Sequence, residues 1–232
     1  MHRRSALAVM ALLLLPGLAF AQDTRPGVAI LPFGNGGSYG QEKEDFEALT
    51  GGLQQLLLVE LALNSGMRLV ERDRLNTLLA EQDLAADGRV DEGTAARIGG
   101  LVGAKYVVIG SFVDWYGDMT LTARLVNSET SELVKATRTK GGREQTMSLL
   151  VELANGITKD LSLPALPRQV QQERESQAAR VPHEAVRLYT KALLYADRGD
   201  KERAIQLFSQ IRQDFPDFSQ AGDALKQLQS GP

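Results

Sequence analysis

The first 161 residues alternate short apolar runs with longer stretches whose apolar side chains recur every three or four positions. Short apolar runs bounded by Gly and other turn residues predict buried strands, and strict alternation of apolar and polar residues predicts a half-buried one. The expected strands are 27–33, 67–70, 105–113, 119–125 and 132–139. The third run is apolar on both faces, which places it at the centre of the sheet. Residues 34–40, 114–118 and 127–130 are expected to be a glycine-rich loop and two turns.

The stretches with helical spacing have their apolar residues on one face, as amphipathic helices do. The expected helices in this part of the chain are 41–64, 73–84, 91–102 and 144–161. Strands and helices in this order predict an α/β domain with a mixed sheet over residues 22–161. It would consist of an N-terminal βαβαα unit, a β-meander and a closing helix.

The pattern changes after Pro164 and Pro167, which end the last helix. Residues 162–182 are polar and rich in Gln, which predicts a linker or a loosely helical spacer. From residue 183 to the C-terminus the spacing predicts an all-α helical hairpin. Its helices are expected at 185–196 and 202–214, and 218–228 could supply one further helix.

The first 21 residues have the three parts of a secretory signal peptide, namely a basic start, an apolar run and a small-x-small cleavage site. Cleavage between Ala21 and Gln22 is expected, with export to the periplasm. A permanent N-terminal membrane anchor is the alternative, but the run is short for a spanning helix. The chain contains no Cys, so a lipid anchor on a Cys after cleavage is not expected, and neither are disulfides.

Composition favours an ordinary globular protein, with 43% hydrophobic and 24% charged residues and a net charge of −3. A mildly acidic chain without a basic stripe is not expected to bind nucleic acid. Beyond the leader, no apolar run approaches the length of a membrane-spanning helix.

Few residues have the chemistry of an active site. After the leader the chain has one His, His183, and its place beside Pro182 indicates a solvated residue at a helix start. The loop at 34–37 lacks the Gly-Lys-Ser/Thr ending of a phosphate-binding loop. The acids Asp87, Asp91 and Glu92 lack the ligand spacing of a calcium loop. We therefore expect no enzyme activity, no cofactor and no metal site.

Trp115 and Tyr116 are two adjacent aromatic residues in a predicted short turn. Aromatic side chains exposed on a turn favour contact with a protein partner. The alternative is that both rings fold back and cover the end of the sheet.

The C-terminal hairpin resembles a tetratricopeptide repeat, in which small and aromatic residues recur at fixed offsets. The residues that carry the resemblance are Leu188, Ala192, Tyr195, Ala204, Phe208, Ile211 and Pro216. In this interpretation Ala192 and Ala204 let two helices touch, whereas Tyr195 and Phe208 fill the space between neighbours. A generic helical hairpin is the alternative, and either one predicts a protein-interaction module.

Three stretches of the first domain resemble the CsgG family and the related N-terminal domain of TolB. They are Leu69–Leu84, Ala95–Phe112 and Ala123–Leu133, and the opening run Val28–Phe33 fits as well. The resemblance implies a role in cell-envelope assembly or secretion, with an envelope protein as partner. The best-known members are lipoproteins that form secretion channels in the outer membrane.

Two departures weaken a direct transfer: this chain has no Cys for a lipid anchor, and its tight turns leave no long hairpins for a channel. We therefore expect a soluble periplasmic accessory protein. A ring-forming channel component, or an activator of peptidoglycan synthesis of the LpoB type, is the alternative. Peripheral association with the outer membrane and homo-oligomerisation stay open.

Overall fold

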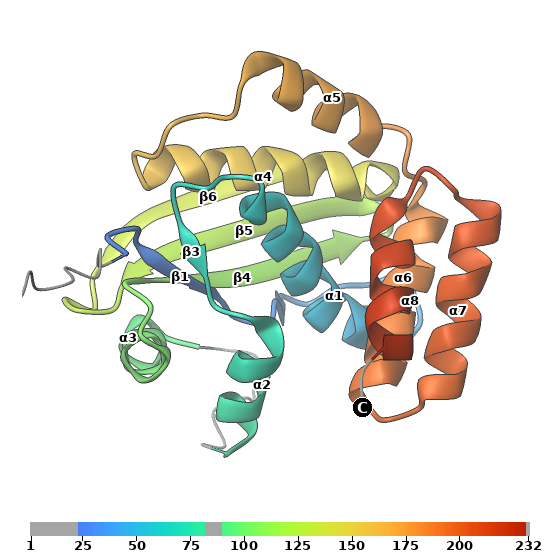
Figure 1. Ribbon diagram of the computed structural model, residues 1–232, viewed down its shortest axis with the longest axis horizontal. Coiled ribbons are helices and arrows are strands. Elements are labelled where there is room, and N and C mark those ends of the chain that lie inside the picture. The colour runs from blue at the N-terminus through green and yellow to red at the C-terminus, as the bar shows by residue number, and fades with distance from the viewer. Residues whose placement is uncertain (1–22, 82–89, 231–232) are drawn as a thin grey trace, which may run out of the picture.

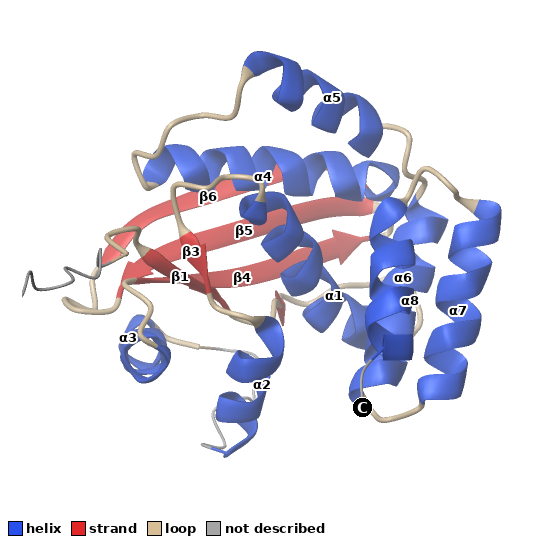
Figure 2. Ribbon diagram, viewed as in Figure 1, coloured by secondary structure: helices blue, strands red, loops and turns tan. Residues whose placement is uncertain are grey.

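The computed structural model of the 232-residue chain describes residues 23–81 and 90–230. The predicted cleavage site at Ala21 and Gln22, the end of the predicted helix 73–84, and Asp87 lie outside the described residues. Within them the prediction of an α/β fold with a mixed sheet, followed by a run of helices, is confirmed (Figures 1 and 2).

The described strands form one mixed sheet in the order β3-β1-β4-β5-β6, and β2 also pairs with β4. The pairings of β1 with β3 and β4, and of β2 with β4, are parallel, whereas β4–β5 and β5–β6 are antiparallel. The strands are β1 (Gly27–Ile30), β2 (Gly34–Asn35), β3 (Arg68–Leu69), β4 (Tyr106–Trp115), β5 (Asp118–Asn127) and β6 (Leu133–Gly142).

Two details of the sheet differ from the prediction. Gly34 and Asn35 were expected in a loop, but they pair with Ser111 and Phe112 and so form β2. The expected turn at 114–118 is shorter, because β4 continues through Trp115 and β5 begins at Asp118. The formation of β2 and the length of this turn both depend on backbone pairing across the sheet, which the pattern of side chains along the chain does not indicate.

The helices follow the expected order with small shifts of their ends. They are α1 (Lys43–Ala62), α2 (Arg72–Glu81), α3 (Glu92–Val102), α4 (Thr146–Asp160), α5 (Arg168–Ala178), α6 (His183–Asp197), α7 (Lys201–Asp214) and α8 (Ser219–Ser230), with a short 3-10 turn at Arg143–Gln145 before α4. The start and end of α3 show why the sequence predicts it well. The Asp91 carboxylate accepts a hydrogen bond from the Thr94 N–H, and Gly103 ends the helix in the left-handed conformation.

The sheet has two unlike faces. One face is covered by α1 and α4, and the C-terminal helices α6, α7 and α8 form a further layer beside α1 (Figures 1 and 2). A single hydrophobic cluster runs from the sheet through these helices. The other face is covered by α2 and α3 with a smaller, separate cluster. Alternating side chains of β1 and β4 contribute to both clusters, as expected for central strands.

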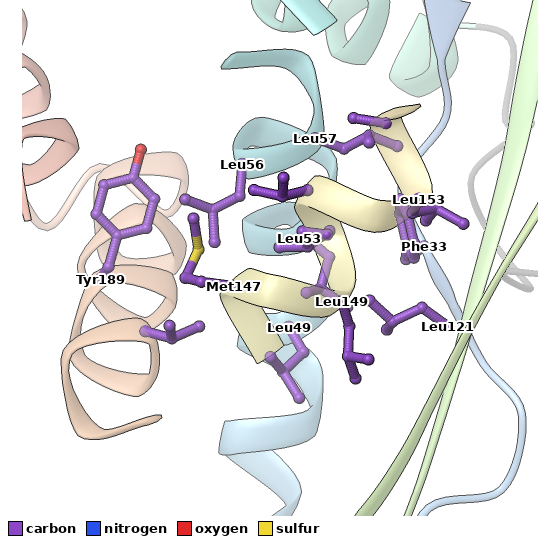
Figure 3. Packing of buried hydrophobic residues seen from close by; sticks show 14 of the residues in the cluster. Phe33, Leu49, Leu53, Leu56, Leu57, Leu121, Met147, Leu149, Leu153 and Tyr189 are labelled. Carbon is purple, nitrogen blue, oxygen red and sulfur yellow. The ribbon is translucent and has the colours of Figure 1, made fainter. Parts of the chain in front are cut away.

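The larger cluster continues from the sheet into the C-terminal helices without interruption. Figure 3 shows the order: Leu121 of the sheet on one side, Leu53 and Leu56 of α1 with Met147 of α4 in the middle, and Tyr189 of α6 on the other side. All are almost fully buried. The C-terminal helices therefore share the core of the α/β part of the chain.

A glycine in the middle of α1 allows α6 to come close. A Cβ atom at Gly52 would overlap the side chain of Thr190 on α6. Glycine inside a helix costs about 1 kcal/mol relative to Ala. Here the cost is offset by the close contact of the two helices, since Thr190 is itself buried against α1.

Ion pairs add to the contact between α1 and the later helices. The buried Asp45 carboxylate lies 2.8 Å from the Lys191 ammonium of α6. Further along α1, the buried Glu60 carboxylate binds the Arg174 guanidinium of α5. The segment 162–182, for which a linker or a loose helix was expected, thus includes a regular helix tied to α1.

The residues named for the tetratricopeptide resemblance have mixed surroundings. Leu188, Ala192, Ala204, Phe208 and Ile211 are buried between the C-terminal helices. Pro216 is exposed. The resemblance to that repeat stays a prediction.

Two aromatic residues of α6 have roles that the sequence did not indicate. Tyr195 is half-buried and packs against the larger hydrophobic cluster; its hydroxyl donates a hydrogen bond to Glu44 of α1, and its ring contacts the Arg203 guanidinium of α7. Tyr189 is fully buried, and its ring meets Phe208 and Phe218 edge to face at centroid distances of 5.6 and 5.3 Å. Aromatic character alone does not separate the two tyrosines, because only the direction of each side chain from α6 decides which one is buried.

Candidate interaction site

The β4–β5 hairpin ends in a two-residue turn at Tyr116 and Gly117. Both have a positive φ, 50° and 103°, which is the backbone that the right-handed twist of a tight hairpin requires. Glycine adopts it freely, but for a residue as large as tyrosine it is uncommon and costs of the order of 1 kcal/mol. The backbone therefore holds the Tyr116 side chain outward at the tip of the hairpin.

Three aromatic side chains are exposed together at this tip. Trp115 is 56% exposed, Tyr116 72% and Tyr39, from the loop after β2, 53%. The Trp115 ring lies edge to face with both tyrosines, at centroid distances of 5.0 Å to Tyr39 and 5.9 Å to Tyr116. We call these three residues the aromatic cluster. The alternative in which Trp115 and Tyr116 fold back over the sheet is wrong, because both rings remain largely open to solvent.

Backbone hydrogen bonds hold the Tyr39 loop against the hairpin. The Tyr39 N–H donates to the Asp114 carbonyl at 2.7 Å, and the Tyr116 N–H donates to the Tyr39 carbonyl at 3.0 Å. The loop thereby extends the pairing of β2 with β4 by one further bridge, between Tyr39 and Trp115. Sequence reasoning missed Tyr39 because this pairing, and not its neighbours along the chain, brings it to the tip.

A buried carboxylate organises the tip from below. The Asp114 side chain is completely buried and accepts two hydrogen bonds from the Arg143 guanidinium, at 2.6 and 2.8 Å. It also accepts from the Gly117 N–H at 2.9 Å and from the amide of Gln41. The Asp114 N–H donates to the Ser38 hydroxyl. One side chain therefore ties together the loop before α1, the hairpin and the turn before α4.

The charge of Asp114 is stabilised at neutral pH. Burial by itself would raise the pKa of this carboxyl group, but the hydrogen bonds from Arg143, Gly117 and Gln41 outweigh it, and the pKa is lowered. A group of this kind is a structural ion pair that fixes the loops around it. The aromatic cluster thus has a backbone that is already ordered before any partner arrives.

His183 lies beside this network at the first residue of α6. It is half-buried, not solvated as expected, and its Nδ1 atom is buried without a hydrogen-bond partner. Burial and the nearby charge of Arg143 lower the pKa of the imidazole, against the opposing effect of Glu144. Its position at the junction of α6 with the turn before α4 indicates a packing role.

Other chemistry is sparse in the part of the chain that the structure describes. No group of three or more His, Asp or Glu side chains is placed to hold a metal ion there. No helix within residues 23–81 and 90–230 is both long and apolar enough to cross a membrane. The site that the described geometry offers is a surface with ordered aromatic side chains.

The fold and this surface define a mixed α/β domain that presents an ordered aromatic tip. Residues 21–118 match the model of the family described as "Curli production assembly/transport component CsgG". The resemblance expected from the sequence is confirmed over these residues. The match includes β1 to β4 and all three residues of the aromatic cluster.

Solved structures similar to this chain include two kinds of protein. The C-terminal domain of LpoB from Escherichia coli is 21% identical, with a TM-score of 0.39, over 50% of this chain and 82% of that one. The PelC dodecamer from Paraburkholderia phytofirmans is 16% identical, with a TM-score of 0.35, over 61% of this chain and 90% of that one. No protein with a curated function matches the sequence.

Proposed function

We propose that this chain is a non-enzymatic accessory protein of cell-envelope assembly or secretion that works in the periplasm, without a lipid anchor, by binding another envelope protein. The CsgG-family match over residues 21–118 supports the assembly role, since that family is described by assembly and transport. The leader-like sequence at residues 1–21 supports export. The observation that carries the proposal is the aromatic cluster held by the buried Asp114–Arg143 pair.

The energetics of binding favour such a surface. Trp and Tyr are enriched among the residues that contribute most to protein interfaces, because each buries a large area and orders few torsion angles. Association normally costs free energy for ordering loops. Here the loop of Tyr39 and the hairpin of Trp115 are already connected through Asp114, so this cost is small.

A second candidate is a ring-forming component of a secretion channel, and one observation favours it. The ten-residue strand β6 is an edge of the sheet, and Leu133 and Val134 at its start are exposed. An unpaired edge is a template for pairing with another chain. However, the exposed Lys135 and Lys140 on the same strand would oppose pairing with a second copy.

The proposal is tested by in-cell photo-crosslinking of the tagged full-length protein, followed by mass spectrometry of the captured proteins. A photoreactive residue replaces Tyr116 in one strain and Leu101 of α3 in a control strain. Leu101 is also exposed, at 51%, but α3 leads into the start of β4, whereas the tip lies at the end of β4. We expect one envelope protein to be enriched at position 116 and not at position 101.

The double variant Trp115→Ser/Tyr116→Ser, with the photoreactive residue moved to Tyr39, should abolish that enrichment while the protein stays folded. Capture of the same proteins at both positions, or unchanged capture in the double variant, would contradict the proposal. Capture of only its own copies would support the ring-forming candidate.

A further inference from the structure

A groove separate from the aromatic cluster lies where the α/β part of the chain meets the C-terminal helices. It has a volume of about 650 Å³ and lies between α1 and α2 on one side and α6 and α8 on the other. That volume is in the range of sites that bind ligands or peptide side chains. None of its lining residues belongs to the aromatic cluster, so it requires its own explanation.

The floor of the groove is apolar. Leu58 and Val59 of α1 line it from one side, and Leu193 of α6, with Ala224 and Leu228 of α8, from the other. All but Leu193 are only partly buried, although the chain around them is well packed. Apolar side chains from three helices thus remain accessible in one hollow, and a partner could bury them further.

The rim of the groove is acidic. Three acidic side chains are exposed around it, namely Glu71 just before α2, Asp73 of α2 and Asp223 of α8. Arg72 also lines the groove, but its charge is taken by an ion pair with Asp197 of α6. The distance from Asp73 to the Arg72 guanidinium is as long as 4.0 Å, and the pair of Asp223 with Lys226 is on the surface. These contacts therefore neutralise little of the negative charge of the rim.

The groove also contains amide side chains that are free to bind. Gln55 of α1 and Gln220 and Gln227 of α8 line it, and none of the three side-chain amides is hydrogen-bonded to another described residue, although the backbone carbonyl of Gln227 accepts from Ser230. An amide side chain offers one acceptor and two donors, which match the N–H and C=O groups of a peptide backbone.

We propose that this groove binds a segment of a protein partner that carries apolar side chains on one face and Lys or Arg beside them. The apolar face would pack on Leu58, Leu193 and Leu228, as an amphipathic helix does in a hydrophobic groove. The basic side chains would meet the acidic rim, whose charge excludes acidic segments and nucleic acid. This goes beyond the proposed function, because it assigns a second binding surface and the chemistry of what it binds.

The test uses the full chain and two fluorescent amphipathic peptides of about 14 residues. The peptides share the same Leu positions, but one has Lys and the other Glu at every polar position. We expect saturable binding of the Lys peptide, measured by anisotropy, with a Kd at least about tenfold lower than that of the Glu peptide, and weaker binding as salt rises.

Two matched triple variants separate the groove from the general charge of the protein. Glu71→Gln/Asp73→Asn/Asp223→Asn neutralises the rim and should raise the Kd of the Lys peptide about fivefold or more. The control Glu129→Gln/Glu132→Gln/Glu202→Gln changes net charge by the same amount at exposed sites away from the groove and should leave the Kd unchanged. Ala224→Trp, which fills the floor, should weaken binding without altering the circular dichroism spectrum.

Equal effects of the two triple variants would overturn the proposal, because they would show attraction to the whole acidic protein. Equal affinity for the Lys and Glu peptides, or no saturable binding of either, would overturn it as well. So would concentration-dependent dimerisation of the chain, by sedimentation, that Ala224→Trp abolishes, since a second copy would then occupy the groove. None of these results depends on Trp115 or Tyr116, so the proposed function is tested apart from this one.

Discussion

The two faces of the sheet carry cores of different extent. On one face, α1 and α4 cover the strands and the cluster continues into α6, α7 and α8. On the other, α2 and α3 cover only part of the strands, and the second cluster ends with them. On this second face the β5 side chains Thr120 and Thr122 remain half-exposed. Arg138 on the neighbouring strand β6 is exposed.

The difference shows how one sheet can be a rigid support on one side and leave surface free on the other. The first face holds the C-terminal helices in place through α1, which positions the acidic groove. The aromatic cluster lies at the end of the sheet, where β4 turns into β5. The predictions below test this contrast, from the largest expected effect to the smallest.

Truncating a fully buried leucine should cost more on the first face than on the second. Leu153 of α4 and Leu75 of α2 are both inaccessible to solvent. We expect Leu153→Ala to lower the free energy of unfolding by about 4 kcal/mol and Leu75→Ala by about 3 kcal/mol, because the larger cluster can collapse less around a cavity. Urea denaturation measures both, and a larger loss for Leu75→Ala would contradict the contrast.

The second-largest loss of stability is expected on removing the Asp114 charge beneath the aromatic cluster. Asp114→Asn breaks a buried ion pair with Arg143 and is expected to cost about 3 kcal/mol at pH 7. Because the folded protein lowers the pKa of Asp114, the stabilisation is present above the unfolded value of about 3.9 and is lost as the pH falls through the lower folded value.

The difference between wild type and Asp114→Asn should therefore be constant from about pH 7 to pH 5 and shrink below about pH 4. Denaturation at a series of pH values measures it. The neighbouring, exposed Asp118→Asn is the control and should change stability by less than about 0.5 kcal/mol. A difference that persists undiminished at pH 3 would mean that the carboxylate charge is not what holds the tip.

Two helical glycines should respond in opposite directions to the same substitution. Gly52→Ala places a methyl group against Thr190 at the α1–α6 contact and should destabilise by about 2 kcal/mol. Gly100→Ala on α3, where a Cβ atom would meet nothing within 4 Å, should stabilise by up to about 1 kcal/mol. Thermal unfolding measures both, and a stabilising effect of Gly52→Ala would show that α6 does not pack closely on α1.

The smallest change in stability is expected on the second face of the sheet, at the strands that α2 and α3 do not cover. Arg138 of β6 is exposed and forms no ion pair with another described residue, so Arg138→Thr should change stability by less than about 0.5 kcal/mol. Its neighbour Thr139 points to α4 and donates a hydrogen bond to the Leu149 carbonyl, so Thr139→Val should cost about 1 kcal/mol. If Arg138→Thr proves the more costly change, a layer must cover this face as well.

Much of the fold could be predicted from local patterns. The alternation of β5, the apolar run of β4, and the cap residues Asp91 and Gly103 of α3 all act between neighbours in sequence, so a single sequence carries their signals. The match of residues 21–118 to the CsgG family includes Val28–Phe33, Leu69–Leu84 and Ala95–Phe112, which carried the resemblance, but ends before Ala123–Leu133. For the candidate site, Trp115 and Tyr116 could be singled out because they are adjacent in a turn.

The remainder of the site depends on contacts between distant segments. Tyr39 reaches the cluster only because its loop pairs with β4, and Asp114 binds Arg143 across 29 positions of sequence. Tyr189, which the local pattern did not single out, meets Phe208 and Phe218 between the C-terminal helices. The groove between α2 and α8 joins residues more than a hundred positions apart, so no local pattern could indicate it.

The sequence by itself determined the order and type of most elements, the apolar faces of the helices and the place of two aromatic residues at the hairpin turn, because periodicity, capping and turn chemistry are local. Only the tertiary structure decided which face of the sheet received the C-terminal helices, and which polar side chains became buried partners. The physical reason is that close packing and burial are set by surfaces that meet after the chain has folded. Gly52 is the clearest example. From the sequence alone it is a glycine that lowers the stability of a helix, whereas in the fold it is the position where α6 contacts α1.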